Sequence, residues 1–257
     1  MTDTITLPDN PPPDPWAALR RHTPARIALG RTGGSLPTAE VLRFAAAHAQ
    51  ARDAVLVPLD VTALQAALQA DGWQPLLARS RAADRATYLR RPDLGRRLAP
   101  ASADLLQHAS VGPVDLAIVL GDGLSAVALQ RHAVPVLQAL RAALAGVLQI
   151  APPVIATQAR VALADEAGAL LQARLVLILL GERPGLSAPD SLGAYLTHAP
   201  QPGCNDAQRN CVSNIRPEGL PPATAAARIA WLAREALRRR TTGIGLKDDS
   251  ATALLAE

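Results

Sequence analysis

The sequence of 257 residues is long enough to bury a sizeable core, either as one large domain or as a domain with a smaller appendage. Its hydrophobic fraction of 49% is typical of a globular protein, and no apolar run reaches the roughly 18 residues of a membrane span. The formal net charge of +4 is modest and aromatic residues make up only 2%, so base-stacking platforms are scarce. We therefore expect neither a nucleic-acid nor a membrane partner.

The start of the chain and its cysteines indicate where the protein works. The N-terminal residues carry acids and prolines, unlike the basic and apolar segments of a secretory signal. Cys204 and Cys211 are the only cysteines, too few for a disulfide framework or a zinc cluster. We therefore expect a cytoplasmic protein with two free thiols and no metal site.

The first part of the chain predicts short helices joined by irregular segments. Residues 1–15 are rich in proline and lack apolar periodicity, which is typical of a mobile lead-in. A short amphipathic helix over residues 16–22 is followed by an extended arm. A longer helix is expected from Pro37 to about Asp53, because a proline suits the first helical turn. This helix is expected to bury an apolar face made of Val41, Leu42, Phe44 and Ala45.

A further helix is expected over residues 61–70, and the densest charge of the chain follows over residues 79–98. That segment is either a solvated surface or an interface with a partner. It also holds apolar side chains with a spacing suited to anchoring it: Tyr88, Leu89 and Leu94. We expect residues 16–110 to form a helical N-terminal domain with an arm.

The second part of the chain alternates strands and helices. The strongest signal is the aliphatic run from Leu175 to Leu180, which is typical of a strand buried on both faces. The resulting β-α-β-α-β order predicts an α/β fold: a Rossmann-like parallel sheet over residues 111–248, with right-handed crossovers and helices on both faces. The expected elements are a strand over residues 115–120, a helix over 125–147, a strand from 154 to 160 or 161, a helix from 165, and the strand over 175–180.

Fewer regular elements are expected after the aliphatic strand. Residues 187–190 match a capping box and predict a short helix. A strand over residues 194–198 and a long polar loop over 201–215 follow, and then an amphipathic helix over 221–240 that ends in three arginines. Residues 249–257 form a C-terminal tail without an assigned role.

Three segments should meet at the carboxyl edge of the predicted sheet: residues 121–125, 160–165 and 181–185. Ligand sites of open α/β folds lie at this edge. Asp122 is expected either to act there or, together with Ser125, to cap the following helix.

Two further residues carry open alternatives. Glu182 either faces a ligand or forms an ion pair with Arg183 or another arginine, and Cys211 has a packed, unreactive thiol as its plain interpretation. No Gly-x-Ser-x-Gly elbow, Walker loop, complete Gly-x-Gly-x-x-Gly fingerprint or His-Glu-x-x-His motif is present. The residues alone therefore predict an α/β ligand-binding domain with no catalytic residues.

Several longer motifs, in one order, resemble the small (light) subunit of ethanolamine ammonia-lyase. The likeness extends from about Trp16 to Asp248. The motifs are TPARIALGR at residues 23–31, SLPT at 35–38, DRATYLRRPDLGRRL at 84–98, GERPGLS at 181–187, DSLGAY at 190–195 and CVSNIR at 211–216.

The resemblance implies a share in an adenosylcobalamin-dependent lyase that converts ethanolamine to acetaldehyde and ammonia by a radical mechanism. In this family the large subunit, a TIM barrel, holds the substrate and the acid and base residues. The small subunit closes the other side of the cofactor, with an assembly of six copies of each subunit. The cobalamin-contacting positions correspond here to Val161, Glu182 and Cys211, and the absence of an Asp-x-His-x-x-Gly motif agrees with base-on cobalamin.

Two points stay open at the level of sequence. The alternative to the lyase subunit is a stand-alone α/β nucleotide-binding or regulatory module without lyase activity, and a basic scaffold protein is a third class. The sequence also leaves open whether a cytoplasmic assembly would be packed into a bacterial microcompartment.

Overall fold

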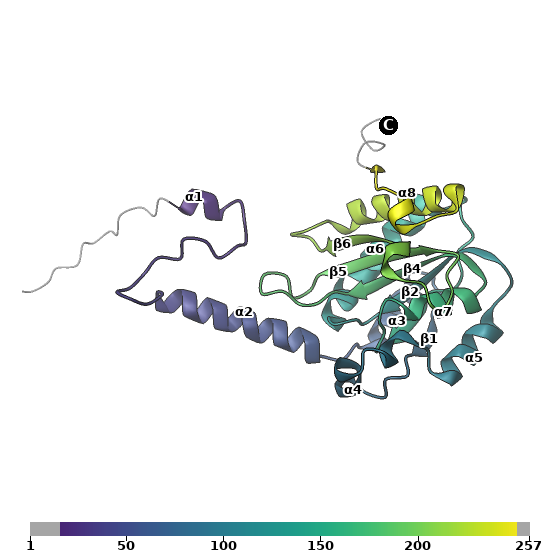
Figure 1. Cartoon of the computed structure of the whole chain (residues 1–257), viewed down its shortest axis with the longest axis horizontal. Coiled ribbons are helices and arrows are strands. Elements are labelled where there is room, and N and C mark those ends of the chain that lie inside the picture. The colour runs from purple at the N-terminus through teal and green to yellow at the C-terminus, as the bar shows by residue number, and fades with distance from the viewer. Residues whose placement is uncertain (1–15, 251–257) are drawn as a thin grey trace, which may run out of the picture. The chain divides into compact units, whose positions relative to one another are not determined.

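The computed structural model describes residues 16–250, which Figure 1 colours from purple near the N-terminus to yellow near the C-terminus. The predicted lead-in over residues 1–15, and residues 251–257 of the predicted tail, lie outside this range. Among the described residues, those up to Ala49 form one compact unit and those from Gln50 onward form another. The sheet belongs entirely to the second unit.

The first unit contains helix α1, Ala17–Arg20, and most of helix α2, Thr38–Leu56. Helix α2 begins directly after Pro37, as predicted, and its many alanines favour the helical backbone. The connecting arm has no helix, and an isolated bridge pairs Thr32 with Ser35.

The expected burial of the apolar face of α2 is wrong. The exposed fractions are 50% for Val41, 63% for Leu42 and 48% for Phe44, and Ala45 is also exposed. Within the described chain, Ala54 is the buried residue of this 19-residue helix. The first unit offers only the short α1 and an irregular arm as neighbours, which is too little surface to cover the helix.

The second unit is built on a six-stranded sheet with the order β1-β3-β2-β4-β5-β6. The first four strands in this order are parallel, whereas β5 is antiparallel to both β4 and β6. The expected strand-helix alternation is confirmed for β2, β3 and β4, but the sheet as a whole is mixed and not purely parallel. The strands are Leu76–Arg79 (β1), Val114–Gly121 (β2), Val154–Thr157 (β3), Ala173–Gly181 (β4), Leu192–His198 (β5) and Arg209–Ile215 (β6).

Helices cover both faces of the sheet, as the sequence predicted (Figure 1). One core lies between the sheet and helices α3, α6 and α8, and the second lies between the sheet and helices α5 and α7. The helices of this unit are α3 Val61–Ala70, α4 Arg85–Arg90, α5 Pro100–Ala109, α6 Ala126–Leu144, α7 Leu163–Leu170 and α8 Pro222–Arg239.

Strand β4 shows why an uninterrupted aliphatic run suits the centre of such a sheet. Leu175, Leu177 and Leu179 belong to the core on one face, whereas Val176 and Ile178 belong to the core on the other. Successive side chains of a strand point to opposite faces, so burial of both faces requires apolar residues at every position. The predicted buried strand is therefore confirmed.

Two strands and one turn differ from the sequence prediction. Strand β1 was not expected, and β6 was expected to be part of a loop. The predicted helix at residues 187–190 is absent, because Gly185 and Ala188 exchange backbone hydrogen bonds in a turn and Asp190 pairs with arginines. The predicted domain boundary near residue 110 stays a prediction; β1, which precedes it, pairs with β3 in the sheet.

Candidate functional site

A cavity of about 860 Å³ lies at the edge of the sheet where β2, β3 and β4 end. The segments 121–125, 160–165 and 181–185 all contribute to its wall, so the prediction that they share one edge is confirmed. The lining residues from these segments are Leu124, Arg160, Val161, Ala162, Gly181, Glu182 and Arg183.

The buried carboxylate of Asp122 holds the backbone at this edge of the sheet in place. The expectation that it helps to cap α6 is wrong, because Ser125 alone does so by accepting a hydrogen bond from the Ala128 N–H. The buried Asp122 carboxylate instead accepts hydrogen bonds of 2.9 and 3.0 Å from the N–H groups of Gln158 and Ala159. Burial raises the pKa of Asp122, and these two bonds oppose the shift. The contact ties the end of β2 to the turn after β3 and ends β3 earlier than predicted.

Tyr88 anchors the charged segment 79–98 to the same edge. Its hydroxyl donates to the Ala159 carbonyl at 3.0 Å, and the guanidinium groups of Arg85 and Arg160 lie over its ring, at 4.8 and 4.3 Å from the ring centroid. Burial raises the pKa of Tyr88 to about 12, so the phenol stays neutral. The expected anchoring of this segment is therefore confirmed for Tyr88, which is fully buried.

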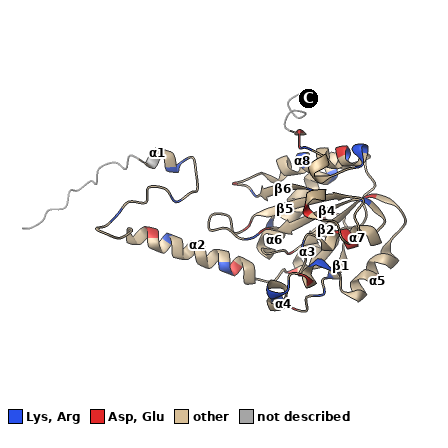
Figure 2. Cartoon of the chain, viewed as in Figure 1, with Lys and Arg blue, Asp and Glu red and all other residues tan. Residues whose placement is uncertain are grey.

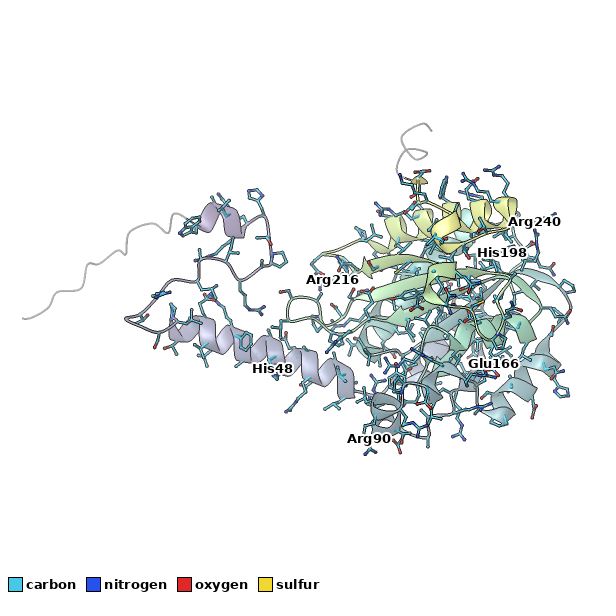
Figure 3. All side chains as sticks on the ribbon, in the orientation of Figure 1. His48, Arg90, Glu166, His198, Arg216 and Arg240 are labelled. Atoms are coloured by element: carbon cyan, nitrogen blue, oxygen red, sulfur yellow. The ribbon has the colours of Figure 1, made fainter. Side chains whose placement is uncertain are left out.

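The charged segment is also joined to α7. Arg97 pairs with Glu166 at 3.0 Å, and the Leu98 N–H donates to the same carboxylate at 3.0 Å. Glu166 is labelled in Figure 3, and Figure 2 shows the basic residues of α4 and the acidic residues of α7 in the second unit. The segment is thus part of the folded unit and not only a solvated surface.

Glu182 stands at the end of β4 with neutral partners. Its carboxylate accepts a hydrogen bond from the Ser191 hydroxyl and another, of 3.3 Å, from the Asn214 N–H. No ion pair of Glu182 is present within residues 16–250, so the expected pairing with Arg183 or another arginine is not found there. The half-buried carboxylate therefore lines the cavity without a neutralising cation among residues 16–250.

Cys211 does not line the cavity but lies next to a residue that does. It is exposed and pairs across β6 and β5 with Tyr195, which lines the cavity. A Cβ atom added at Gly193 would come within 2.8 Å of the Glu182 carboxylate and 3.2 Å of the Tyr195 ring, so both side chains cover Gly193. Desolvation of the sulfur raises the pKa of Cys211, and the nearby Glu182 charge adds to this effect. The thiol is therefore neutral and a weak nucleophile.

Arg209 is a buried arginine that was not singled out from the sequence, and it holds one wall of the cavity in place. Arg209, on β6, donates to both Asp165 oxygens at 2.6 and 2.8 Å, to the Thr197 hydroxyl at 2.9 Å and to the Cys204 carbonyl at 2.8 Å. These bonds hold the loop 202–206, which lines the cavity. From the sequence, residue 165 is placed only at the start of an expected helix, and no local signal in the sequence indicates the partner of Asp165.

Within the described part of the chain, no group of three or more His, Cys, Asp or Glu side chains is arranged to hold a metal ion. None of the helices described there combines the length and the apolar composition needed to cross a membrane.

Comparisons with known proteins agree on one family. The model of the family described as "Ethanolamine ammonia-lyase light chain (EutC)" matches residues 13–247. A protein of Azotobacter vinelandii named ethanolamine ammonia-lyase small subunit is 58% identical, with 99% of this chain and 94% of that protein covered. A protein with the same name from Ralstonia nicotianae is 56% identical, with 94% of this chain and 91% of that protein covered. One from Xanthomonas campestris pv. campestris is 53% identical, with 98% of this chain and 94% of that protein covered. The chain therefore belongs to the ethanolamine ammonia-lyase light chain family.

Proposed function

We propose that the chain acts as the small subunit of an adenosylcobalamin-dependent lyase that converts ethanolamine to acetaldehyde and ammonia. Its role is to form one wall of the cobalamin site and to dock on the large subunit, which holds the substrate. The observation that carries the proposal is the convergence of Val161 and Glu182 on one cavity, although 20 residues of chain lie between them. Cys211, the third position implied by the family resemblance, does not line the cavity but pairs between strands with Tyr195, which does.

The connections of the sheet support a Rossmann-like site in residues 111–248. From β2 the chain passes through α6 to β3 on one side, and then through α7 to β4 on the other side of β2. Helices α6 and α7 pack on opposite faces of the sheet. The end of β2 is thus a topological switch point, which is where open α/β sheets bind ligands. Asp122 and Leu124 directly follow this strand.

The residues of the cavity fit the chemistry of a corrinoid. The rim of a corrin ring carries amide side chains that donate hydrogen bonds, and Glu182 offers carboxylate oxygens at the cavity wall. Val161, Leu180 and Tyr195 add apolar surface that can pack against the ring. When bound, adenosylcobalamin supplies the carbon radical that starts the reaction. The chain's own residues bind and orient the cofactor and shield one side of it from water.

Docking on the large subunit is supported by surfaces that the chain itself leaves uncovered. Val41, Leu42 and Phe44 are exposed on α2, and four arginines of the charged segment are also exposed. Arginine and aromatic side chains such as phenylalanine are enriched in protein interfaces. The four arginines are Arg90, Arg91, Arg96 and Arg97. We include in the proposal a cytoplasmic assembly of six copies of each subunit, with packaging in a microcompartment left to experiment.

Co-expression with a large subunit tests the proposed function. The chain alone, the large subunit alone and the co-purified complex are each supplied with adenosylcobalamin and ethanolamine, and ammonia release is measured. We expect activity from the complex only. Ammonia release by the chain alone, or a complex that forms but neither binds cobalamin nor releases ammonia, contradicts the proposal. Binding of a nucleotide by the chain alone would favour the stand-alone module instead.

A further inference from the structure

The cavity wall carries more positive than negative charge. Arginines line it at five positions and carboxylates at three. Arg97 is neutralised by Glu166, and Arg209 is neutralised by Asp165. The remaining arginines have no ion pair with any residue of the described chain: Arg96, Arg160 and Arg183.

Arg160 is the most rigidly held of these three. Its guanidinium stacks on the Tyr88 ring, and its Nη2 donates to the Tyr88 carbonyl at 3.5 Å. Its backbone N–H donates to the Gly95 carbonyl at 2.8 Å. A Cβ atom added at Gly95 would come within 2.9 Å of the Arg160 Cγ, so only glycine leaves room for this side chain. An arginine already fixed in this way loses little further conformational freedom when it binds a ligand.

Not every N–H group of the Arg160 guanidinium has a hydrogen-bond acceptor within the described residues. Its Nε is buried and has no hydrogen-bond partner within the described residues. A buried donor without a partner is unfavourable, so the guanidinium gains from electrostatic contact with an oxyanion, to which its N–H groups at the cavity can donate in pairs. Arg96 follows Gly95 and lines the same cavity, so it adds a second, more exposed cation. Together they form a wall suited to a phosphate group.

We propose that Arg160, assisted by Arg96, binds the phosphodiester in the nucleotide loop of the cobalamin. This inference rests on the proposed function. Adenosylcobalamin carries a single negatively charged side group, and this group is that phosphodiester. Arg160 precedes Val161, one of the positions that the family resemblance assigns to cobalamin. The wall would thereby select complete cobalamins over corrinoids that lack the phosphate.

A series of three corrinoids isolates the phosphate. Cobinamide lacks the whole nucleotide loop, cobinamide phosphate adds a phosphate group, and cyanocobalamin carries the complete loop. Each is titrated into the purified complex with the large subunit, and the dissociation constant is obtained from the absorbance change or by equilibrium dialysis. We expect cobinamide phosphate to bind about tenfold or more tightly than cobinamide, as a charge-assisted contact allows.

Substitutions assign this preference to residues. Arg160→Gln should remove most of the preference for cobinamide phosphate, measured as the ratio of the two dissociation constants, and Arg160→Lys, which keeps the charge, should retain part of it. Arg96→Gln changes an exposed side chain, so it should weaken the preference without affecting the fold. Arg234→Gln, an equal change of charge on the exposed side of α8, serves as the control.

Two outcomes separate failure of this inference from failure of the proposed function. If the unmodified complex binds cyanocobalamin but shows no preference for cobinamide phosphate, or if Arg160→Gln and Arg96→Gln keep that preference, the phosphate contact is refuted while the cobalamin site stands. If the unmodified complex binds none of the three corrinoids, the cobalamin site itself is refuted, and the phosphate contact with it.

Discussion

The substitution Glu182→Gln tests the part of the site on which the proposal depends most. Gln keeps the size and shape of the side chain but removes the charge and replaces one acceptor oxygen with a donor. In the native chain the carboxylate accepts hydrogen bonds from the Ser191 hydroxyl and the Asn214 N–H. Both donors bond to the same carboxylate oxygen, Oε2, so the carbonyl oxygen of the introduced amide can accept both bonds. We therefore expect the fold to survive.

The magnitude follows from the charge and the burial of the carboxylate. A hydrogen bond from a ligand amide to a charged acceptor contributes about 1.5–3 kcal/mol when it is shielded from water. Because Glu182 is half-buried and the large subunit would cover the cavity further, we expect a loss of cobalamin affinity of about ten- to a hundredfold. Ammonia release at saturating cobalamin should fall much less, since Glu182 binds the cofactor and does not touch the substrate in the proposed site.

The assay is cobalamin titration of the complex, with the melting temperature and the co-purified amount of large subunit measured in parallel. Glu235→Gln is a matched control, because it makes the same chemical change on α8, where Glu235 pairs with Arg238 and Arg239. Unchanged cobalamin affinity in a Glu182→Gln complex that assembles normally would refute the reasoning. Glu182 would then serve only to join β4 to the segments that hold Ser191 and Asn214.

Three further predictions concern the fold and the partner. Gly95→Ala should destabilise the chain by about 1–3 kcal/mol, measured by chemical unfolding, because the new methyl group meets Arg160 and Tyr88 at 2.9 and 3.0 Å; an unchanged unfolding midpoint would contradict the packing. Partial burial raises the pKa of Asp190, but its bonds to Arg131 and Arg216 outweigh this and leave the pKa below 3.8. The ionised carboxylate therefore stabilises the fold fully above pH 3.8, and this stabilisation is lost as the pH falls through the lowered pKa. The difference in melting temperature between the native chain and Asp190→Asn should accordingly shrink on acidification. A constant difference from neutral pH to pH 3 would argue against the ion pairs. Finally, replacing the four exposed arginines of the charged segment together with Gln should reduce co-purification with the large subunit while the circular dichroism spectrum stays normal. Undiminished recovery would show that this segment is not an interface. The four positions are Arg90, Arg91, Arg96 and Arg97.

The elements that could be predicted from the sequence are those whose signal is local. Helix α3 was predicted with its observed bounds; Gly72 follows its end, and the structure adds that the Asp60 side chain caps its start. Strand β4 was predicted because six aliphatic residues in succession fit a strand buried on both faces better than a short helix. The helix that starts at the paired prolines was also found, as α8, since a proline in the first turn and arginines in the last are strong end signals.

The elements that could not be predicted depend on distant partners. Strand β6 has polar residues at most positions and lies at the edge of the sheet, and one of its buried residues is Arg209. A charged residue can be buried there only because Asp165, from another part of the chain, neutralises it. The four residues of β1 are too few to show a period, and only their pairing with β3 identifies them as a strand.

The candidate site was predictable as a location but not as a set of contacts. The shared edge followed from the strand ends, and it brought Val161 and Glu182 together. Of the two alternatives for Asp122, the helix cap is wrong, because its partners are the backbone N–H groups of residues 158 and 159 and the Arg85 guanidinium. The stacking of Arg160 on Tyr88 joins residues far apart in the chain, which no local pattern reveals.

The same reasoning explains why the chain contains both a tightly fixed edge and an uncovered helix. At the edge, Asp122 and Tyr88 use buried hydrogen bonds to hold the turn that carries Arg160 and Val161, as a cofactor wall requires. On α2, by contrast, apolar side chains such as Phe44 are exposed, and each ordered residue of the neighbouring arm costs about 1–2 kcal/mol of backbone entropy. The proposed large subunit would supply further contacts that offset this cost. The exposed face of α2 is therefore part of the surface that we propose contacts that subunit.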